Sequence, residues 1–157
     1  MKGKLTHLDA RGQARMVDVG KKQKSVRTAI ARGLVRMQPA TLRTLLEGKL
    51  PKGDVLAVAR IAGIQAAKRT WELIPMCHQV ALTSVRVELT PSGDDAIAIE
   101  VAATAADRTG VEMEALTAVS VAALTLYDML KAIDRGIVIE SIALYEKTGG
   151  KSGDFRR

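Results

Sequence analysis

From Ala115 to Tyr127 the chain carries no charged side chain, although the surrounding pattern is that of its longest helix. The apolar residues are spread over the whole circumference of this helix, and its repeated alanines leave room for a neighbour to approach closely. A small domain cannot cover all of such a helix with one sheet. We therefore expect the helix to pack on its own sheet and, on another side, against a second copy of the chain.

The other segments predict strands and helices in the order of a split βαβ motif. Strands are predicted by alternation, or by enrichment in Val, Ile and Thr, at residues 25–37, 80–89, 96–102 and 137–145. Helices are expected at residues 39–47, 55–70 and 113–133. Pro39 suits the first turn of one helix, and Asp54 suits the N-cap of the next. This order predicts an α+β, ferredoxin-like fold in which an antiparallel sheet carries the helices on one face.

The chain has the size of one domain, which we expect to span residues 1–157. Within it, we expect an irregular arm at residues 1–23 and a mobile glycine-rich tail at residues 147–157. A single cysteine allows no internal disulfide, which fits a reducing cytoplasm. No uncharged apolar stretch of about 18 residues and no secretory leader are visible, so neither a membrane span nor export is expected.

A net charge of +7 indicates an anionic partner, and two classes of partner compete. Nucleic acid is the usual partner of a basic protein, and it binds through its phosphates. This chain has only one Trp, two Tyr and one Phe, so aromatic platforms for single-stranded bases are scarce. We therefore expect a small polyphosphate ligand and no nucleic acid.

Four short segments combine charged or polar groups with glycines, prolines or helix ends. They hold Lys52 before Gly53, Met76-Cys77-His78 after Pro75, Glu112 and Glu114 after Gly110, and Lys147 and Lys151 around Gly149-Gly150. From the residue patterns alone, Lys52 is most simply a solvated loop lysine, and the two glutamates are most simply partners of the helix dipole. Cations next to glycines and helix N-termini are also what a phosphorylated ligand needs.

Asp128 and Lys131 are three residues apart on the long helix, so they share a face and can form an ion pair. At a surface such a pair contributes little. These two residues follow thirteen uncharged positions, and a lysine buried there can lose its proton near neutrality while the paired aspartate stays ionised. Such a pair would supply a general base and a general acid.

Cys77 and His78 raise the alternatives of a cysteine nucleophile and of a zinc site. Neighbours on an extended segment point to opposite faces, which disfavours a Cys–His catalytic pair. One cysteine and two histidines cannot complete the usual tetrahedral zinc site without carboxylates. We therefore expect neither covalent cysteine catalysis nor a metal centre.

Taken in this order and at this spacing, these segments resemble the molybdenum cofactor biosynthesis protein C family, the cyclic pyranopterin monophosphate synthases. The resemblance runs from His7 and Met16-Val17-Asp18-Val19 to Phe155. One departure is visible, because the family usually has Cys-His-Pro where this chain has Cys77-His78-Gln79. The resemblance implies a lyase that converts 3′,8-cyclo-7,8-dihydroguanosine 5′-triphosphate to cyclic pyranopterin monophosphate and releases pyrophosphate.

The resemblance also implies a role for each matching residue. Catalysis would rest on Lys52, Asp128 and Lys131. The substrate would contact Met76, Cys77, His78, Glu112, Met113 and Glu114, while Lys147 and Lys151 would hold the departing pyrophosphate. No cofactor is required, although Mg²⁺ could accompany the triphosphate. The family points to a hexamer built as a trimer of dimers, with sites at the dimer interface. The competing hypothesis is a non-catalytic nucleotide- or RNA-binding basic oligomer.

Overall fold

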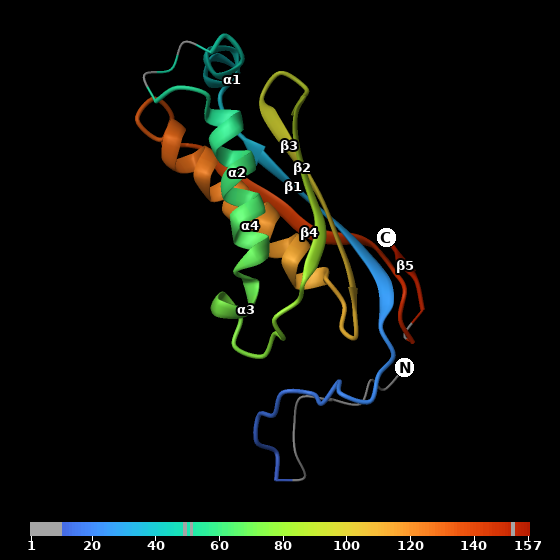
Figure 1. Ribbon diagram of the computed structural model, residues 1–157. Coiled ribbons are helices and arrows are strands. Elements are labelled where there is room, and N and C mark those ends of the chain that lie inside the picture. The colour runs from blue at the N-terminus through green and yellow to red at the C-terminus, as the bar shows by residue number, and fades with distance from the viewer. Residues whose placement is uncertain (1–10, 49, 51, 152) are drawn as a thin grey trace.

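A five-stranded antiparallel sheet with helices on one face forms the body of the protein (Figure 1). The structure is a computed structural model that describes residues 11–48, 50, 52–151 and 153–157. In chain order the elements are β1 (Ser25–Arg36), α1 (Pro39–Leu46), α2 (Val55–Lys68), α3 (Thr70–Leu73), β2 (Leu82–Ser92), β3 (Ala96–Asp107), α4 (Glu112–Leu130), β4 (Val138–Thr148) and β5 (Phe155–Arg156).

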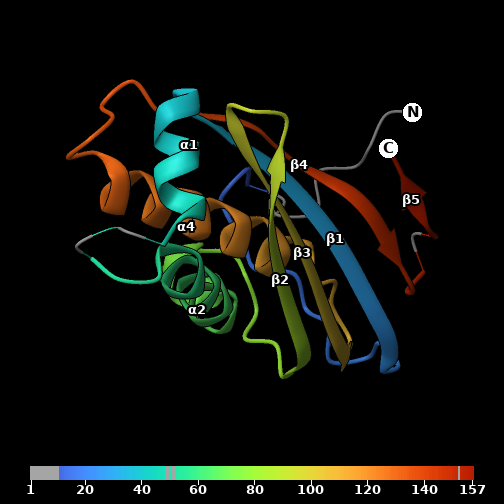
Figure 2. The same ribbon diagram turned by 90° about the horizontal axis from the view of Figure 1, so that it is seen from above.

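The strand order is β2-β3-β1-β4-β5, and each neighbouring pair is antiparallel. Seen from above, α2 and α4 lie on one side of this sheet (Figure 2). The expected α+β class, the antiparallel sheet and the placement of the helices are thus confirmed.

Alternation along β1 explains which face of the sheet is buried. Ala29, Ala31 and Val35 point to the helices and are buried, while Arg32 and Arg36 lie on the opposite face. On the buried face α4 comes so close that a Cβ atom at Gly33 would lie 2.6 Å from Cγ1 of Val119. Any larger residue at this position of the central strand would force Val119 or its helix to shift.

The uncharged stretch of α4, from Ala115 to Tyr127, is the centre of the core, as its composition predicts. Its alanines at 115, 118, 122 and 123 are buried, and α2 packs against it so closely that a Cβ atom at Gly63 would lie 3.1 Å from the carbonyl oxygen of Ala118. By length and mean hydropathy, 1.3, α4 would also suit a membrane span, but half of that window is buried inside the protein. Such burial is typical of a core helix.

Part of the helical layer stays uncovered by the residues that the structure describes. Leu124 of α4 is 57% exposed, and Val58 and Ile61 of α2 are exposed as well. These apolar side chains are the surface that the expected second copy of the chain would cover, and that expectation stays a prediction.

Several boundaries differ from the sequence-based expectations. Helix α4 ends at Leu130 and not at residue 133, and the helix expected at residues 55–70 is divided into α2 and α3. Lys147 belongs to β4 and not to an irregular tail, because β1 offers backbone partners as far as the pair Thr28 and Thr148. The last residues are not wholly irregular either, since Phe155 pairs with Lys147.

The described part of the N-terminal arm, residues 11–24, runs below the lower end of the sheet in Figure 1. No strand forms between residues 15 and 24, where an extended piece is expected near residues 16–19. A turn in which the Lys22 N–H donates to the Val19 carbonyl, at 3.0 Å, precedes β1. His7 lies outside the described residues.

Candidate functional site

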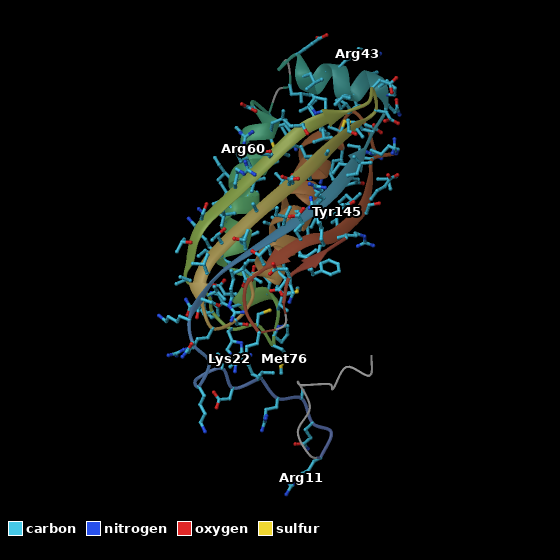
Figure 3. All side chains as sticks on the ribbon, turned by 90° about the vertical axis from the view of Figure 1, so that its right-hand side faces the viewer. Arg11, Lys22, Arg43, Arg60, Met76 and Tyr145 are labelled. Atoms are coloured by element: carbon cyan, nitrogen blue, oxygen red, sulfur yellow. The ribbon has the colours of Figure 1, made fainter. Side chains whose placement is uncertain are left out.

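A hollow of about 380 Å³ lies where the arm, the segment after α3 and the first turn of α4 meet. We call it the acidic pocket; it is lined by Val17, Val19, Lys22, Met76, Cys77, His78, Val80, Thr109, Gly110, Glu112, Met113 and Glu114. Figure 3 shows Lys22 and Met76 close together at this end of the molecule. Every residue predicted to contact the substrate ring thus lies around one hollow.

The two glutamates of the pocket differ in their surroundings, although both lie in the first turn of α4. Oε1 of Glu112 lies 3.2 Å from Nζ of Lys147, so β4 supplies it with a cation. Glu114 is only 4% exposed, and its burial, together with the charge of Glu112, raises its pKa from 4.5 to about 7 against the effect of its own backbone N–H. A carboxyl group that titrates near neutrality in a hollow is typical of a functional site.

The raised pKa predicts a pH-dependent effect of Glu114→Gln on stability. Folded Glu114 keeps its proton to a higher pH than the unfolded chain does, so the wild-type protein loses stability as the pH rises from about 4.5 through 7. Gln cannot ionise, so at about pH 8 the variant should be more stable by on the order of 3 kcal/mol. At about pH 4.5 the two proteins should differ little. Urea unfolding at both pH values measures this, and a difference independent of pH would contradict it.

Cys77 and His78, two of the residues expected to contact the substrate, both line the acidic pocket. They follow a turn in which the Cys77 N–H donates to the Ile74 carbonyl at 3.1 Å. Burial, and then the charge of Glu114, raises the pKa of the Cys77 thiol, which disfavours the nucleophilic thiolate. Among the described residues, no three His, Cys, Asp or Glu side chains come together as metal ligands would.

A second charged group, which we call the lysine cluster, lies at the opposite end of α4. Nζ of Lys131 lies 2.7 Å from Oδ1 of Asp128, and Nζ of Lys52 donates to the backbone carbonyl of Asp128 at 3.1 Å. Nζ of Lys52 also lies 3.9 Å from Oδ2 of Asp128. The predicted ion pair between Asp128 and Lys131 is confirmed, and Lys52 joins it from the loop before α2.

The protonation expected for Lys131 is wrong for a single chain. Its side chain is exposed at the end of the helix, and the hydrogen bond with Asp128 raises the pKa of Lys131 above its ordinary value. The same hydrogen bond lowers the pKa of Asp128. Desolvation, the effect that would favour a neutral lysine, is weak at this exposed side chain and is outweighed by the hydrogen bond to Asp128.

The acidic pocket and the lysine cluster are too far apart to act on one reacting centre within a chain. Glu114 and Asp128 are fourteen residues apart on one continuous helix, which corresponds to about 21 Å. The structure therefore brings together the residues within each group but not the two groups.

A larger hollow of about 700 Å³ adjoins the acidic pocket. We call it the basic basin; it is lined by Lys21, Lys22, Gln23, Lys24, Ser25, Arg27, Gly150 and Lys151. Of the two lysines predicted to hold pyrophosphate, Lys151 lies here, whereas Lys147 lies beside Glu112.

Comparison with known proteins assigns the chain to a family. Residues 16–150 match the MoaC family. The chain belongs to the MoaC family. A curated relative from Thermomicrobium roseum, named cyclic pyranopterin monophosphate synthase, is 61% identical over 154 residues, which cover 98% of this chain and 93% of the relative.

The MoaC-family match spans the acidic pocket and the lysine cluster, whereas Lys151 lies just beyond it. The residue-by-residue predictions missed part of the acidic pocket, namely Val17, Val19, Lys22, Val80, Thr109 and Gly110. Val17 and Val19 belong to the segment Met16-Val17-Asp18-Val19, which carries the family resemblance. The resemblance could therefore have pointed to these two residues. For Lys22 only the tight group of lysines at 21, 22 and 24 pointed to a role.

Proposed function

We propose that this MoaC-family protein converts 3′,8-cyclo-7,8-dihydroguanosine 5′-triphosphate to cyclic pyranopterin monophosphate and releases pyrophosphate, a lyase reaction of molybdenum cofactor biosynthesis. The observation that carries the proposal is the 61% identity, over nearly the whole chain, to a relative named for this product. The acidic pocket supports it, because a guanine-derived ring offers adjacent N–H donors that carboxylates can accept. Glu112 and Glu114 both line this pocket.

The reacting centre is completed by a second copy of the chain. About 21 Å separates Glu114 from Asp128 within a chain, so the acidic pocket of one copy takes the lysine cluster of another. The exposed apolar residues Val58, Ile61 and Leu124 on the helical layer support such an assembly. A homohexamer built as a trimer of dimers, with sites at the dimer interface, would meet this requirement.

In this composite site Lys52 and Lys131 stabilise the charge that develops when a ribose-derived hydroxyl attacks the α-phosphate. The hydrogen bond to Asp128 raises the pKa of Lys131, so this lysine enters the reaction protonated and acts first as an acid. Asp128 orients it, at 2.7 Å.

Lys147 and Lys151 hold the departing pyrophosphate in this proposal. The reaction needs no redox or carbon-transfer cofactor, and Mg²⁺ could accompany the triphosphate as its counterion. The single cysteine and the small anionic substrate fit an enzyme of the reducing cytoplasm.

The deciding experiment supplies the purified full-length protein with the cyclised GTP intermediate and measures pyrophosphate and pterin product together. Equal amounts of both products are the expected result. A non-catalytic nucleotide- or RNA-binding oligomer would instead bind the intermediate with a steep salt dependence and release no pyrophosphate. That outcome would refute the proposed activity.

A truncation tests the contribution of the C-terminal residues. Deleting residues 149–157 removes Lys151 and the two-residue strand β5 but leaves β4 and the core intact. We expect the free energy of unfolding to fall by no more than about 1 kcal/mol, because exposed termini carry little packing. The Kd for the substrate should rise at least about tenfold, as expected for losing one charged contact. Calorimetry on a Lys131→Met background, which we expect to bind the substrate without converting it, measures this, and an unchanged Kd would remove Lys151 from the site.

A further inference from the structure

Asp134 is a buried carboxylate that lies outside the acidic pocket, the basic basin and the ion pairs of the lysine cluster. It is only 2% exposed. Its Oδ2 accepts hydrogen bonds from the Gln38 N–H at 2.9 Å and from the Thr41 hydroxyl at 3.1 Å, and its Oδ1 accepts one from the Gly136 N–H at 2.9 Å. The bond from the Gln38 N–H is the main cause that holds the pKa of Asp134 below its ordinary value, so the carboxylate is ionised at neutral pH.

The bonds from Gln38 and Thr41 place this charge at the N-terminus of α1. Gln38 is the N-cap residue of this helix, but its own side chain makes no capping hydrogen bond. The first turn of α1 contains no acidic residue either. Asp134 therefore caps α1 from the turn that follows α4, and its negative charge is attracted to the positive end of the helix dipole.

The turn that contains Asp134 and the helix that it caps both lead to the lysine cluster, and they lie at the same end of the molecule (Figure 2). Asp134 follows Lys131 by three residues, and its N–H donates to the Leu130 carbonyl at 3.1 Å, which closes the turn onto the end of α4. In the other direction, the chain continues from the end of α1 to Lys52. Nζ of Lys52 then returns to the end of α4, at the backbone carbonyl of Asp128. These contacts form a closed ring.

Lys52 depends on this ring because little else holds its side chain. The side chain is 47% exposed, so its position is set by the backbone that carries it. Helix α2, which follows Lys52, is fixed by its close packing on α4 at Gly63. Helix α1, which precedes Lys52, has only eight residues. A helix this short is marginal by itself, so its position depends on the contacts that anchor it.

We infer that Asp134 is a positioning residue, which ties α1 to the end of α4 and thereby holds Lys52 against the backbone carbonyl of Asp128. The kinetic part of this inference rests on the proposed function, in which Lys52 stabilises charge at the α-phosphate. The geometric part does not, because the contact between Lys52 and Asp128 is a property of the chain itself.

The first test measures how fast acetic anhydride acetylates Lys52 in the full-length protein, by mass spectrometry of its peptides. Asp134→Ala removes all three hydrogen bonds of the carboxylate. Lys52 should then lose its bond to Asp128 and react about 2- to 10-fold faster, as expected for the loss of one hydrogen bond. Exposed Lys68, at the end of α2, should react at an unchanged rate in the same molecules. An unchanged rate at Lys52 would overturn the inference.

Thr70→Val controls for a general loss of stability. Thr70 is 1% exposed, and its hydroxyl donates to the carbonyls of Ala66 and Ala67, so this change also removes buried hydrogen bonds. Figure 1 shows α3, to which Thr70 belongs, at the opposite end of the molecule from α1. The control should leave the acetylation rate of Lys52 unchanged. Equal acceleration in Thr70→Val and Asp134→Ala would assign Asp134 a merely structural role.

Thr41→Val and Thr44→Val test the same tie without removing a buried charge. Both threonines belong to α1, but the Thr41 hydroxyl donates to Asp134, whereas the Thr44 hydroxyl donates to the Ala40 carbonyl within the helix. Only Thr41→Val should accelerate the acetylation of Lys52. This pair decides the question even if Asp134→Ala does not fold, and equal rates in the two variants would contradict the inference.

The kinetic test compares the effect of Asp134→Ala in two backgrounds, with the cyclised GTP intermediate as substrate. In the wild type the change should lower kcat about 10- to 100-fold, the effect of a misplaced catalytic group. In the Lys52→Met background it should lower the residual kcat less than about twofold, because the charge that Asp134 positions is already absent. A residue with a merely structural role would lower both rates by the same factor, and that result would refute the kinetic part.

These outcomes separate the role of Asp134 from the proposed activity. If the protein releases no pyrophosphate but the acetylation of Lys52 responds as expected, the activity fails and the positioning role stands. If the protein is active and the acetylation of Lys52 is indifferent to Asp134 and Thr41, the activity stands and the positioning role fails.

Discussion

Replacement of either Lys52 or Lys131 by methionine is expected to abolish turnover while the fold and the assembly stay intact. Methionine keeps the length of the side chain and removes the charge that both lysines hold around Asp128. Deleting one electrostatic group from a closed site typically costs about 2 to 4 kcal/mol of transition-state stabilisation, or about 30- to 900-fold in kcat. The amount of pyrophosphate formed in a single turnover, measured after quenching, reports this loss independently of how fast the products leave the enzyme.

The control for these variants is Lys68→Met, which removes an exposed lysine from the end of α2 outside both the acidic pocket and the lysine cluster. It should react at the wild-type rate. Because Lys52 and Lys131 are both exposed, neither substitution should change the free energy of unfolding by more than about 0.5 kcal/mol. Near-wild-type rates in both variants would remove these lysines from the mechanism.

Two inactive variants, Glu114→Ala and Asp128→Ala, are expected to restore activity to each other when their chains are mixed. The length of α4 keeps the two residues about 21 Å apart within a chain, so each site must draw on two chains. In a two-fold dimer of randomly mixed chains, half of the pairs are mixed. Each mixed pair rebuilds one of its two sites. About a quarter of the wild-type activity should therefore return.

The variants are unfolded together, refolded and assayed, with each variant refolded alone as the background. Distinct tags on the two chains allow the mixed oligomers to be isolated and their share to be counted. A matched control mixes Glu114→Ala with Glu112→Ala, two changes in the same acidic pocket, and should recover much less activity. No recovery in confirmed mixed oligomers would refute the two-chain site.

The features that the sequence determined depend on neighbours along the chain. The apolar run of α4 identified the core helix, and the spacing of three between Asp128 and Lys131 identified their ion pair. The alternation along β1 identified its buried face. These relations follow from helical and strand periodicity, which does not depend on the rest of the fold.

Other features were decided only by the tertiary structure. Lys147 lies in β4 beside Glu112 because the register between β1 and β4 brings it there. Asp134 is buried, which its sequence neighbours do not predict. Its carboxylate can be buried because it accepts hydrogen bonds from the backbone N–H of Gln38 and the hydroxyl of Thr41, which are distant in sequence. The exposure of the Lys131 side chain, and with it the upward direction of its pKa shift, likewise could not be predicted from the sequence. Such contacts join residues that are distant in sequence, and they depend on sheet register and helix packing, which no local pattern encodes.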